Sequence, residues 1–185
     1  RPVILVFDGC YHGMVDDAFV TLKDGVPAMK PGLLGQVHDL TATTRVVPFN
    51  DPEALAAALA PGDVAAVLAE PAMTNCGMIL PRPGFLDAIR DLTRRAGTLL
   101  VIDETHTIST APGGYGRAHG LEPDMLVVGK AIAGGVPAAV WGVTAELSEH
   151  MDAAAARTGP GQSGIGTTLS GTFTTIANSL SSAAS

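Results

Sequence analysis

The sequence predicts an α/β fold in which a mostly parallel sheet is flanked by helices. Short runs of apolar and β-branched residues recur along the 185-residue chain, and helical segments separate them. Several runs are continuously apolar without alternation, which is typical of strands covered on both faces. The connections of a dozen or more residues are what parallel crossovers require. With 46% hydrophobic residues, the chain can form one domain with a sizeable core.

Six apolar runs are the predicted strands, and glycine, proline or aspartate bounds them. A short apolar run alone does not distinguish a strand from a buried helix. The strand assignment therefore depends on the alternation with helices. In chain order the runs are residues 3–7, 45–47, 64–70, 98–103, 125–129 and 138–143.

Three segments are the predicted helices. Asp51 is a suitable N-cap and Pro52 a suitable first residue for an Ala-rich helix that ends before Pro61. In the second segment, residues 84–96, the apolar side chains share one stripe and the charged side chains face water. The third segment covers residues 144–157.

Composition and charge exclude several classes of partner. The net charge is −7, and no basic cluster is present, which argues against nucleic acid because phosphate binding needs grouped Lys and Arg. No apolar stretch approaches the roughly 20 residues that span a bilayer. The two cysteines, Cys10 and Cys76, are too few for a disulfide scaffold and lack metal-ligand spacing. We therefore expect a cytoplasmic protein with no metal and no nucleic-acid or membrane partner.

Polar residues follow four of the predicted strands. Sites in parallel sheets form at the carboxyl ends of strands, so these residues are the first candidates for a site. They are Asp8 with Tyr11 and His12, Glu70 with Asn75, Asp103 with Glu104, and Lys130.

Lys130 is the candidate nucleophile. It follows Met-Leu-Val-Val-Gly and precedes a run of small residues, which leaves room for a large planar ligand. A lysine forms an imine with an aldehyde only when its amine is neutral, and a partly desolvated pocket promotes the neutral form. Taken singly, Lys130 could also be a surface lysine in a turn.

Asp103 ends an apolar run, where a carboxylate is unfavourable unless a cation pairs with it. A pyridinium nitrogen is such a cation, and an aspartate beside it keeps the ring protonated and electron-withdrawing. A helix N-cap or a metal ligand are the alternatives for Asp103 alone.

Several motifs occur together with Asp103 and Lys130. Asp103-Glu104-Thr105 is followed along the chain by Lys130 within Gly-Lys-x-Ile-x-Gly-Gly-x-Pro. Five further segments are Phe-Asp-Gly-Cys-Tyr-His-Gly (7–13), Pro-Phe-Asn-Asp (48–51), Glu-Pro-Ala-Met-Thr-Asn-Cys-Gly (70–77), Pro-Arg-Pro-Gly-Phe-Leu (81–86) and Thr-Leu-Ser-Gly (168–171). In this order the motifs resemble class III aminotransferases that depend on pyridoxal 5'-phosphate (PLP), in particular their glutamate-1-semialdehyde 2,1-aminomutase-like branch.

The resemblance implies a fold type I PLP-dependent transferase large domain and a set of roles. Lys130 would form the Schiff base with PLP and move the proton between substrate and cofactor, and Asp103 would hold the ring nitrogen. Tyr11 would stack on the ring, and His12 would shape the pocket. Thr168 would bind the phosphate of a neighbouring subunit's cofactor, which implies a homodimer with shared active sites.

Three further cofactor-binding positions mark the subgroup and its departures from the family pattern. Asn75 stands where many class III enzymes that use 2-oxoglutarate have Glu, and could bind the cofactor's phenolic oxygen. Thr105 replaces a usual Val, and its methyl group could still face the ring. His106 replaces a usual Gln or Met, and could contact the phenolic oxygen or fill space. Glu70 is then expected to be structural.

The expected function is amino transfer between an amine or amino acid and an oxo acid or aldehyde through Lys130. An aminomutase, or a PLP-dependent epimerase or decarboxylase, is the alternative on the same scaffold. A scaffold that has lost its chemistry is disfavoured by the intact Asp103 and Lys130. A dinucleotide-binding domain would need Gly-x-Gly-x-x-Gly after the first strand, and residues 9–13 do not supply this motif. We expect residues 1–185 to be a fragment of the large PLP-binding domain, without the N-terminal phosphate-cup segment and the C-terminal small domain.

Overall fold

The structure is a computed structural model, and it describes residues 1–158. The described chain divides into two units, Arg1–Trp141 and a second unit that begins at Gly142. The candidate site lies entirely in the first unit.

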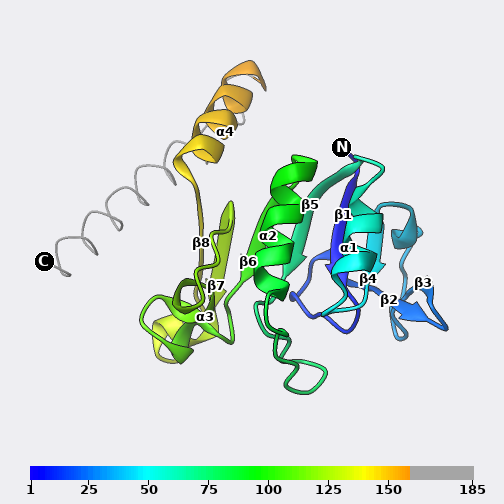
Figure 1. Cartoon of the computed structure of the whole chain (residues 1–185), viewed down its shortest axis with the longest axis horizontal. Helices are drawn as coiled ribbons and strands as arrows, with labels where there is room; N and C mark the ends of the chain where they lie inside the picture. Colours follow the sequence, from blue (N-terminus) through cyan, green and yellow to red (C-terminus); the bar gives the residue numbers. More distant parts are fainter. Residues whose placement is uncertain (159–185) are drawn as a thin grey trace, which may run out of the picture. The chain divides into compact units, whose positions relative to one another are not determined.

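A six-stranded sheet with the strand order β4-β1-β5-β6-β7-β8 forms the centre of the fold (Figure 1). β1 pairs in parallel with β4 and β5, and the pairs β5–β6 and β6–β7 are also parallel. The predicted α/β class and mostly parallel sheet are therefore confirmed. The strands are β1 Val3–Phe7, β4 Thr44–Val47, β5 Val64–Ala69, β6 Leu99–Asp103, β7 Met125–Gly129 and β8 Ala139–Val143.

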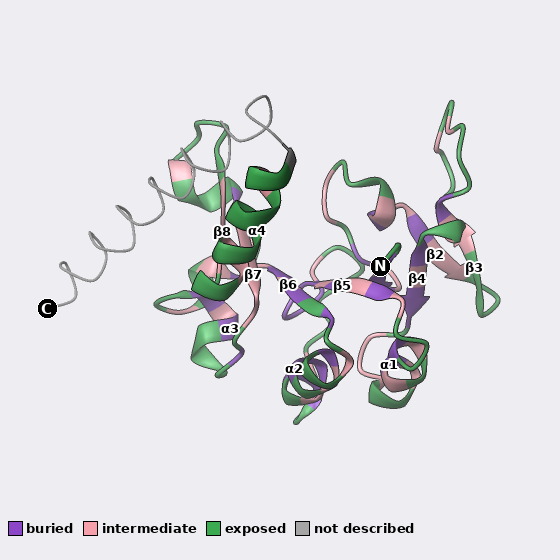
Figure 2. Cartoon of the chain, turned by 90° about the horizontal axis from the view of Figure 1, so that it is seen from above, coloured by how far each residue is buried: buried purple, intermediate pink, exposed green. Residues whose placement is uncertain are grey.

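Two helices cover one face of the sheet, as the view from above shows (Figure 2). They are α1 Pro52–Leu59 and α2 Phe85–Ala96. The Asp51 carboxylate accepts a 2.8 Å hydrogen bond from the Ala54 amide, so the predicted N-cap is confirmed. Gly97 caps the end of α2, and its φ of 59° suits a residue without a side chain.

Aromatic side chains from the end of β1, the loop after β4 and the start of α2 pack together. Phe7, Phe49 and Phe85 form a cluster of edge-to-face rings with centroids 4.9 to 5.8 Å apart. Each such pair adds about 0.5 to 1.5 kcal/mol beyond the burial of its area. This cluster fixes the end of β1, from which the first part of the site begins.

An antiparallel hairpin of β2 Val20–Lys23 and β3 Val26–Met29 is not among the predicted strands. Asp24 and Gly25 form its turn with φ of 53° and 79°, as a two-residue hairpin requires. The Asp-Gly pair was the available signal. Asp8 anchors the hairpin, because its carboxylate accepts hydrogen bonds from the Thr21 hydroxyl at 2.6 Å and the Leu22 amide at 2.8 Å.

The remaining elements are short, except the last helix. α3 spans Gly114–Ala118, and 3-10 turns cover Asp16–Ala18, Leu40–Ala42, Ile108–Thr110 and Lys130–Ala133. In the second unit, α4 spans Ala145–Thr158, within one residue of the predicted helix at each end. No helix in residues 1–158 is long and apolar enough to cross a membrane.

Candidate active site

Four adjacent strands bring their carboxyl ends to the same edge of the sheet. β1, β5, β6 and β7 are neighbours and run in parallel, so the residues after each strand meet there. This edge holds seven of the predicted site residues within the described chain. They are Tyr11 and His12 after β1, Asn75 after β5, Asp103, Thr105 and His106 at and after β6, and Lys130 after β7.

The His12 and Asp103 side chains form a buried pair, although their positions are far apart in the sequence. His12 Nδ1 lies 2.9 Å from Asp103 Oδ2. The exposed fraction is 2% for the His12 side chain and 13% for that of Asp103. The Thr105 amide donates a 2.9 Å hydrogen bond to the other oxygen, Asp103 Oδ1. Asp103 is therefore held in one orientation by two contacts.

The pair stabilises the charged form of both partners. Burial alone would lower the pKa of His12, but its contacts with Asp103 and Cys10 raise that pKa from 6.5 to about 9. Burial acts to raise the pKa of Asp103, but hydrogen bonds with His12 and Thr105 hold it below its usual value. At neutral pH the site therefore contains an anionic Asp103 beside a protonated His12.

Lys130 stands immediately after β7 in an uncommon backbone conformation. Its φ of 51° lies in the left-handed region, which non-glycine residues seldom occupy and which costs on the order of 1 kcal/mol or more. The Lys130 side chain is exposed at the edge of the sheet. Its Nζ lies 2.8 Å from Nε2 of His106.

His106 also contacts the loop after β5. Its Nδ1 is 2.5 Å from the Thr74 hydroxyl, and that hydroxyl donates to Glu70 Oε2 at 2.7 Å. The Thr74 amide donates to the same carboxylate oxygen at 3.2 Å. Glu70 thus holds Thr74, as expected of a structural residue, and Thr74 holds His106. Thr74 was not among the predicted site residues, although it lies in the motif of residues 70–77.

Three more predicted residues follow the same strands: Asn75, Tyr11 and Thr105. Asn75 is exposed, and its amide donates a long 3.4 Å hydrogen bond to the Thr74 hydroxyl. The Tyr11 side chain is half-exposed after β1. A Cβ added at Gly129 would lie 3.6 Å from both Cγ2 and Oγ1 of Thr105, so the Thr105 side chain lies over the end of β7. Thr168 is outside the described residues.

The register of β6 and β7 sets the span between the two groups that the resemblance singles out. Asp103 pairs with Val127, so Lys130 lies three residues farther along the neighbouring strand direction. At about 3.3 Å per residue this is roughly 10 Å. Asp103 and Lys130 therefore lie at the ends of adjacent strands, offset along the strand direction by this length.

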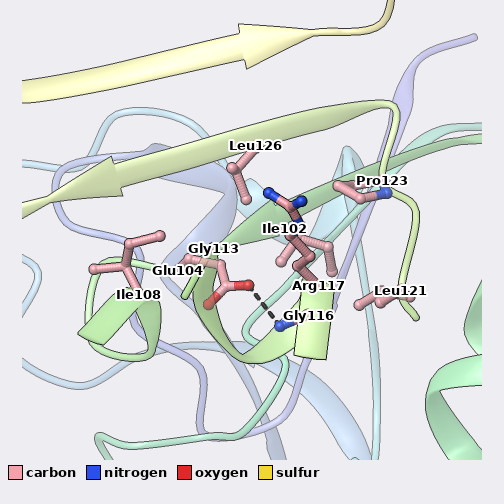
Figure 3. Close-up of a pocket in the computed structure, with 9 residues that line it drawn as sticks. All are labelled: Ile102, Glu104, Ile108, Gly113, Gly116, Arg117, Leu121, Pro123 and Leu126. Carbon is pink, nitrogen blue, oxygen red and sulfur yellow. Dashed lines mark hydrogen bonds between the residues drawn. The ribbon is translucent and has the colours of Figure 1, made fainter. Parts of the chain in front are cut away.

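Glu104 is turned to a different environment from Asp103. It lines a cavity of 310 Å³ whose other walls are mostly apolar (Figure 3). The buried carboxylate accepts hydrogen bonds from the Thr107 hydroxyl at 2.7 Å and from the Tyr115 and Gly116 amides at 3.0 and 2.7 Å. Its role is to hold α3 against the end of β6.

A glycine-rich run at residues 113–116 contains glycines that lie against Glu104. A Cβ on Gly114 or Gly116 would lie 2.7 to 2.8 Å from the Glu104 carboxylate oxygens, which is closer than side-chain atoms approach. Small residues in this run are therefore needed for the carboxylate to reach the backbone amides. The sequence alone did not connect this run with Glu104.

Comparison with known proteins decides the family. A family model described as class III aminotransferase matches residues 1–183, nearly the whole chain. The chain belongs to the class III aminotransferase family. The resemblance predicted from the motifs is confirmed, and the sheet and its helices have the fold type I arrangement of PLP-dependent aminotransferases.

The chain is similar to curated glutamate-1-semialdehyde 2,1-aminomutases. That of Sorangium cellulosum (strain So ce56) is 40% identical over 80% of this chain and 35% of its own length. That of Syntrophus aciditrophicus (strain SB) is 42% identical over 77% of this chain and 34% of its own length. The chain thus spans about a third of the length of the curated relatives it matches.

Solved structures are also similar to the chain. A glutamate-1-semialdehyde aminomutase from Pseudomonas aeruginosa PAO1 has a TM-score of 0.82 and 50% identity, and covers 88% of this chain and 36% of its own. A lysine-to-alanine variant of that enzyme was solved in complex with PMP. An omega-transaminase from Sphaerobacter thermophilus has a TM-score of 0.72 and 34% identity, over 80% of this chain and 36% of its own.

The cofactor of class III aminotransferases is PLP, and the residues at the sheet edge fit it. Asp103 is a largely buried carboxylate that keeps its negative charge, as a protonated ring nitrogen requires. Lys130 supplies an accessible primary amine immediately after the neighbouring strand β7. Tyr11 offers an aromatic ring at the same edge. The residue that would bind the phosphate, Thr168, lies beyond the described part of the chain.

Proposed function

We propose that this protein moves an amino group between an amine or amino acid and a carbonyl compound, using PLP bound between Asp103 and Lys130. The observation that supports it most is the placement of these two residues at the ends of adjacent parallel strands. Family membership supports the same chemistry.

Each residue at the sheet edge has a separate role in this proposal. When bound, PLP supplies an electron-withdrawing ring that stabilises negative charge on the substrate carbon. Asp103 holds the ring nitrogen, and the protonated His12 keeps Asp103 ionised and correctly oriented. Lys130 would hold the cofactor covalently through its Nζ atom, and that atom would then carry the proton. Tyr11, Thr105 and Asn75 would contact the ring, and Thr168 would bind the phosphate.

An aminomutase is the second candidate function, and a specific observation favours it. The curated relatives reported above carry that name, and so does the solved structure at 50% identity. Asn75 is in agreement, since it provides an uncharged amide where many enzymes that use 2-oxoglutarate have Glu. A solved omega-transaminase at 34% identity supports the first candidate.

Two substrates separate these candidates. The full protein with PLP is incubated with a simple amine and pyruvate, and in parallel with glutamate 1-semialdehyde alone. Formation of alanine supports amino transfer between two molecules. Isomerisation of glutamate 1-semialdehyde without a second substrate supports the aminomutase, and inactivity in both assays argues against both proposals.

The proposal includes an assembly and a location. We infer a homodimer in which Thr168 reaches the neighbour's cofactor, because closed two-fold dimers are the commonest assembly of soluble proteins. Residues 1–185 are proposed to form part of the large PLP-binding domain, which agrees with the third of the relatives' length that they cover. A cytoplasmic location agrees with two cysteines that form no disulfide.

A further inference from the structure

A line of hydrogen bonds leads from a buried carboxylate to the amine of Lys130. Glu70 is 5% exposed, and its Oε2 accepts from the Thr74 hydroxyl at 2.7 Å. The same hydroxyl lies 2.5 Å from His106 Nδ1, and His106 Nε2 lies 2.8 Å from Lys130 Nζ. The line joins residues that follow β5, β6 and β7.

The chemistry of these groups fixes the position of each proton. A carboxylate only accepts hydrogen bonds, so the single proton of the Thr74 hydroxyl points to Glu70. The hydroxyl oxygen must then accept from His106, which places a proton on Nδ1. In the neutral imidazole Nε2 therefore carries a lone pair, and this lone pair faces Lys130.

We propose that His106 is a catalytic base that takes a proton from Lys130 whenever the lysine amine adds to a carbonyl carbon. Thr74 and Glu70 are positioning residues that fix the His106 tautomer and stabilise its protonated form. The inference rests on the proposed function, in which Lys130 is the nucleophile. It adds a residue that works on the lysine rather than on the cofactor.

The step balances without an external reagent. The Nζ lone pair forms the bond to carbon, and the π electrons of the carbonyl move to its oxygen. The nitrogen is then positively charged, and His106 Nε2 removes one of its protons. The imidazolium returns this proton to the oxygen, which leaves as water with the second proton of the amine while the C=N bond forms. No group is oxidised or reduced.

Both ring nitrogens of His106 have partners in this arrangement. Nδ1 contacts Thr74 and Nε2 contacts Lys130. A contact with the phenolic oxygen of PLP, which the sequence suggested, would require His106 to release one of them. The geometry therefore favours a role toward Lys130.

A small aldehyde tests the inference without any cofactor. The full protein, freed of PLP, is treated with formaldehyde and cyanoborohydride, and methylation of each lysine is followed by peptide mass spectrometry. The chain has three lysines, and the exposed Lys23 is the internal reference. The initial rate at Lys130 is expressed relative to that at Lys23.

The decisive variant is His106→Gln. Its amide can still donate to Thr74 and accept from Lys130, but it is not a base. Since a general base contributes roughly 10²-fold or more, we expect the Lys130-to-Lys23 ratio to fall by about that factor. An unchanged ratio overturns the inference.

Variants of Thr74 test the positioning role. Thr74→Val removes the acceptor that orients His106, so the ratio should fall, and Thr74→Ser should restore it. Equal ratios in the Val and Ser variants would contradict this part of the inference.

Failure of the two proposals is distinguishable. A wild-type protein that binds no PLP while its ratio still depends on His106 contradicts the proposed function and supports the inference. A protein that binds PLP at Lys130, but whose methylation ratio does not depend on His106, supports the proposed function and contradicts the inference about His106.

Discussion

His12 Nδ1 lies 2.9 Å from Asp103 Oδ2, and both side chains are largely buried. This contact joins the loop after β1 to the end of β6. A protonated histidine in this place opposes any tendency of Asp103 to take up a proton. It also makes the stability of the site depend on pH in a defined direction.

The first prediction concerns the pH dependence of this pair. The pKa of His12 is raised from 6.5 to about 9 in the folded chain. Its contribution to stability is therefore fully present below pH 6.5 and is lost as pH rises through about 9. Asp103 has a lowered pKa, so its contribution is present above its ordinary range and lost as pH falls through the folded value.

His12→Asn should therefore lower the free energy of unfolding most near pH 6, by on the order of 2 to 3 kcal/mol, with the difference shrinking above pH 9. Urea denaturation near pH 6 and above pH 9 measures the free energy of unfolding of both proteins. The exposed His38, changed to Asn, is the matched control. A difference between wild type and His12→Asn that stays constant from pH 6 to 10 would show that the pair is not charged.

Asp103→Asn should separate charge from shape at the ring nitrogen. We expect amino transfer to fall by roughly 10²-fold or more, because the neutral amide does not hold a positive charge on the ring. The pKa of His12 should fall in the same variant, since its acceptor loses its charge, and NMR titration of His12 measures this. Asp63→Asn, in a surface pair with Arg45, is the control that should keep full activity. Full activity in Asp103→Asn would show that the Asp103 carboxylate is not needed for amino transfer.

Gly116→Ala should destabilise the chain through Glu104. The new methyl group would lie 2.8 Å from Glu104 Oε1, so the buried carboxylate must shift away from its backbone donors. Overpacking of this kind costs about 1 to 3 kcal/mol, visible as a lower melting temperature. Gly142→Ala is the control, because a Cβ there meets no atom within 4 Å. Equal melting temperatures for the two variants would contradict the role assigned to Glu104.

Asp8→Ala should loosen the β2–β3 hairpin. It leaves the Thr21 hydroxyl and the Leu22 amide without their acceptor, at a cost of about 1 to 3 kcal/mol. Limited proteolysis should then cleave faster within residues 20–29. Asp91→Ala, at an exposed position of α2, should not change the cleavage rate. Resistance equal to wild type would mean that other contacts hold the hairpin.

The sequence predicted the main sheet well because buried parallel strands are continuous apolar runs. β1 and β7 begin and end at the predicted residues. The β2–β3 hairpin was not predicted, because its strands are short, partly exposed and include Pro27. They therefore lack the continuous apolar run of a buried strand.

The candidate site was likewise predicted only in part. Parallel strand ends converge, so the sequence could gather His12, Asp103 and Lys130 at one edge. It could not pair His12 with Asp103 or His106 with Lys130, because such contacts depend on register and side-chain direction. The use of Glu104 as an anchor for α3 likewise depends on glycines that meet it only in three dimensions.

The most direct test is to find where PLP is attached. The full protein is incubated with PLP, reduced with borohydride and digested, and the modified lysine is identified by mass spectrometry. The predicted result is a pyridoxyl group on Lys130 and none on Lys23 or Lys30, with no label in Lys130→Ala. Label on another lysine, or no label in the wild type, would contradict the central claim.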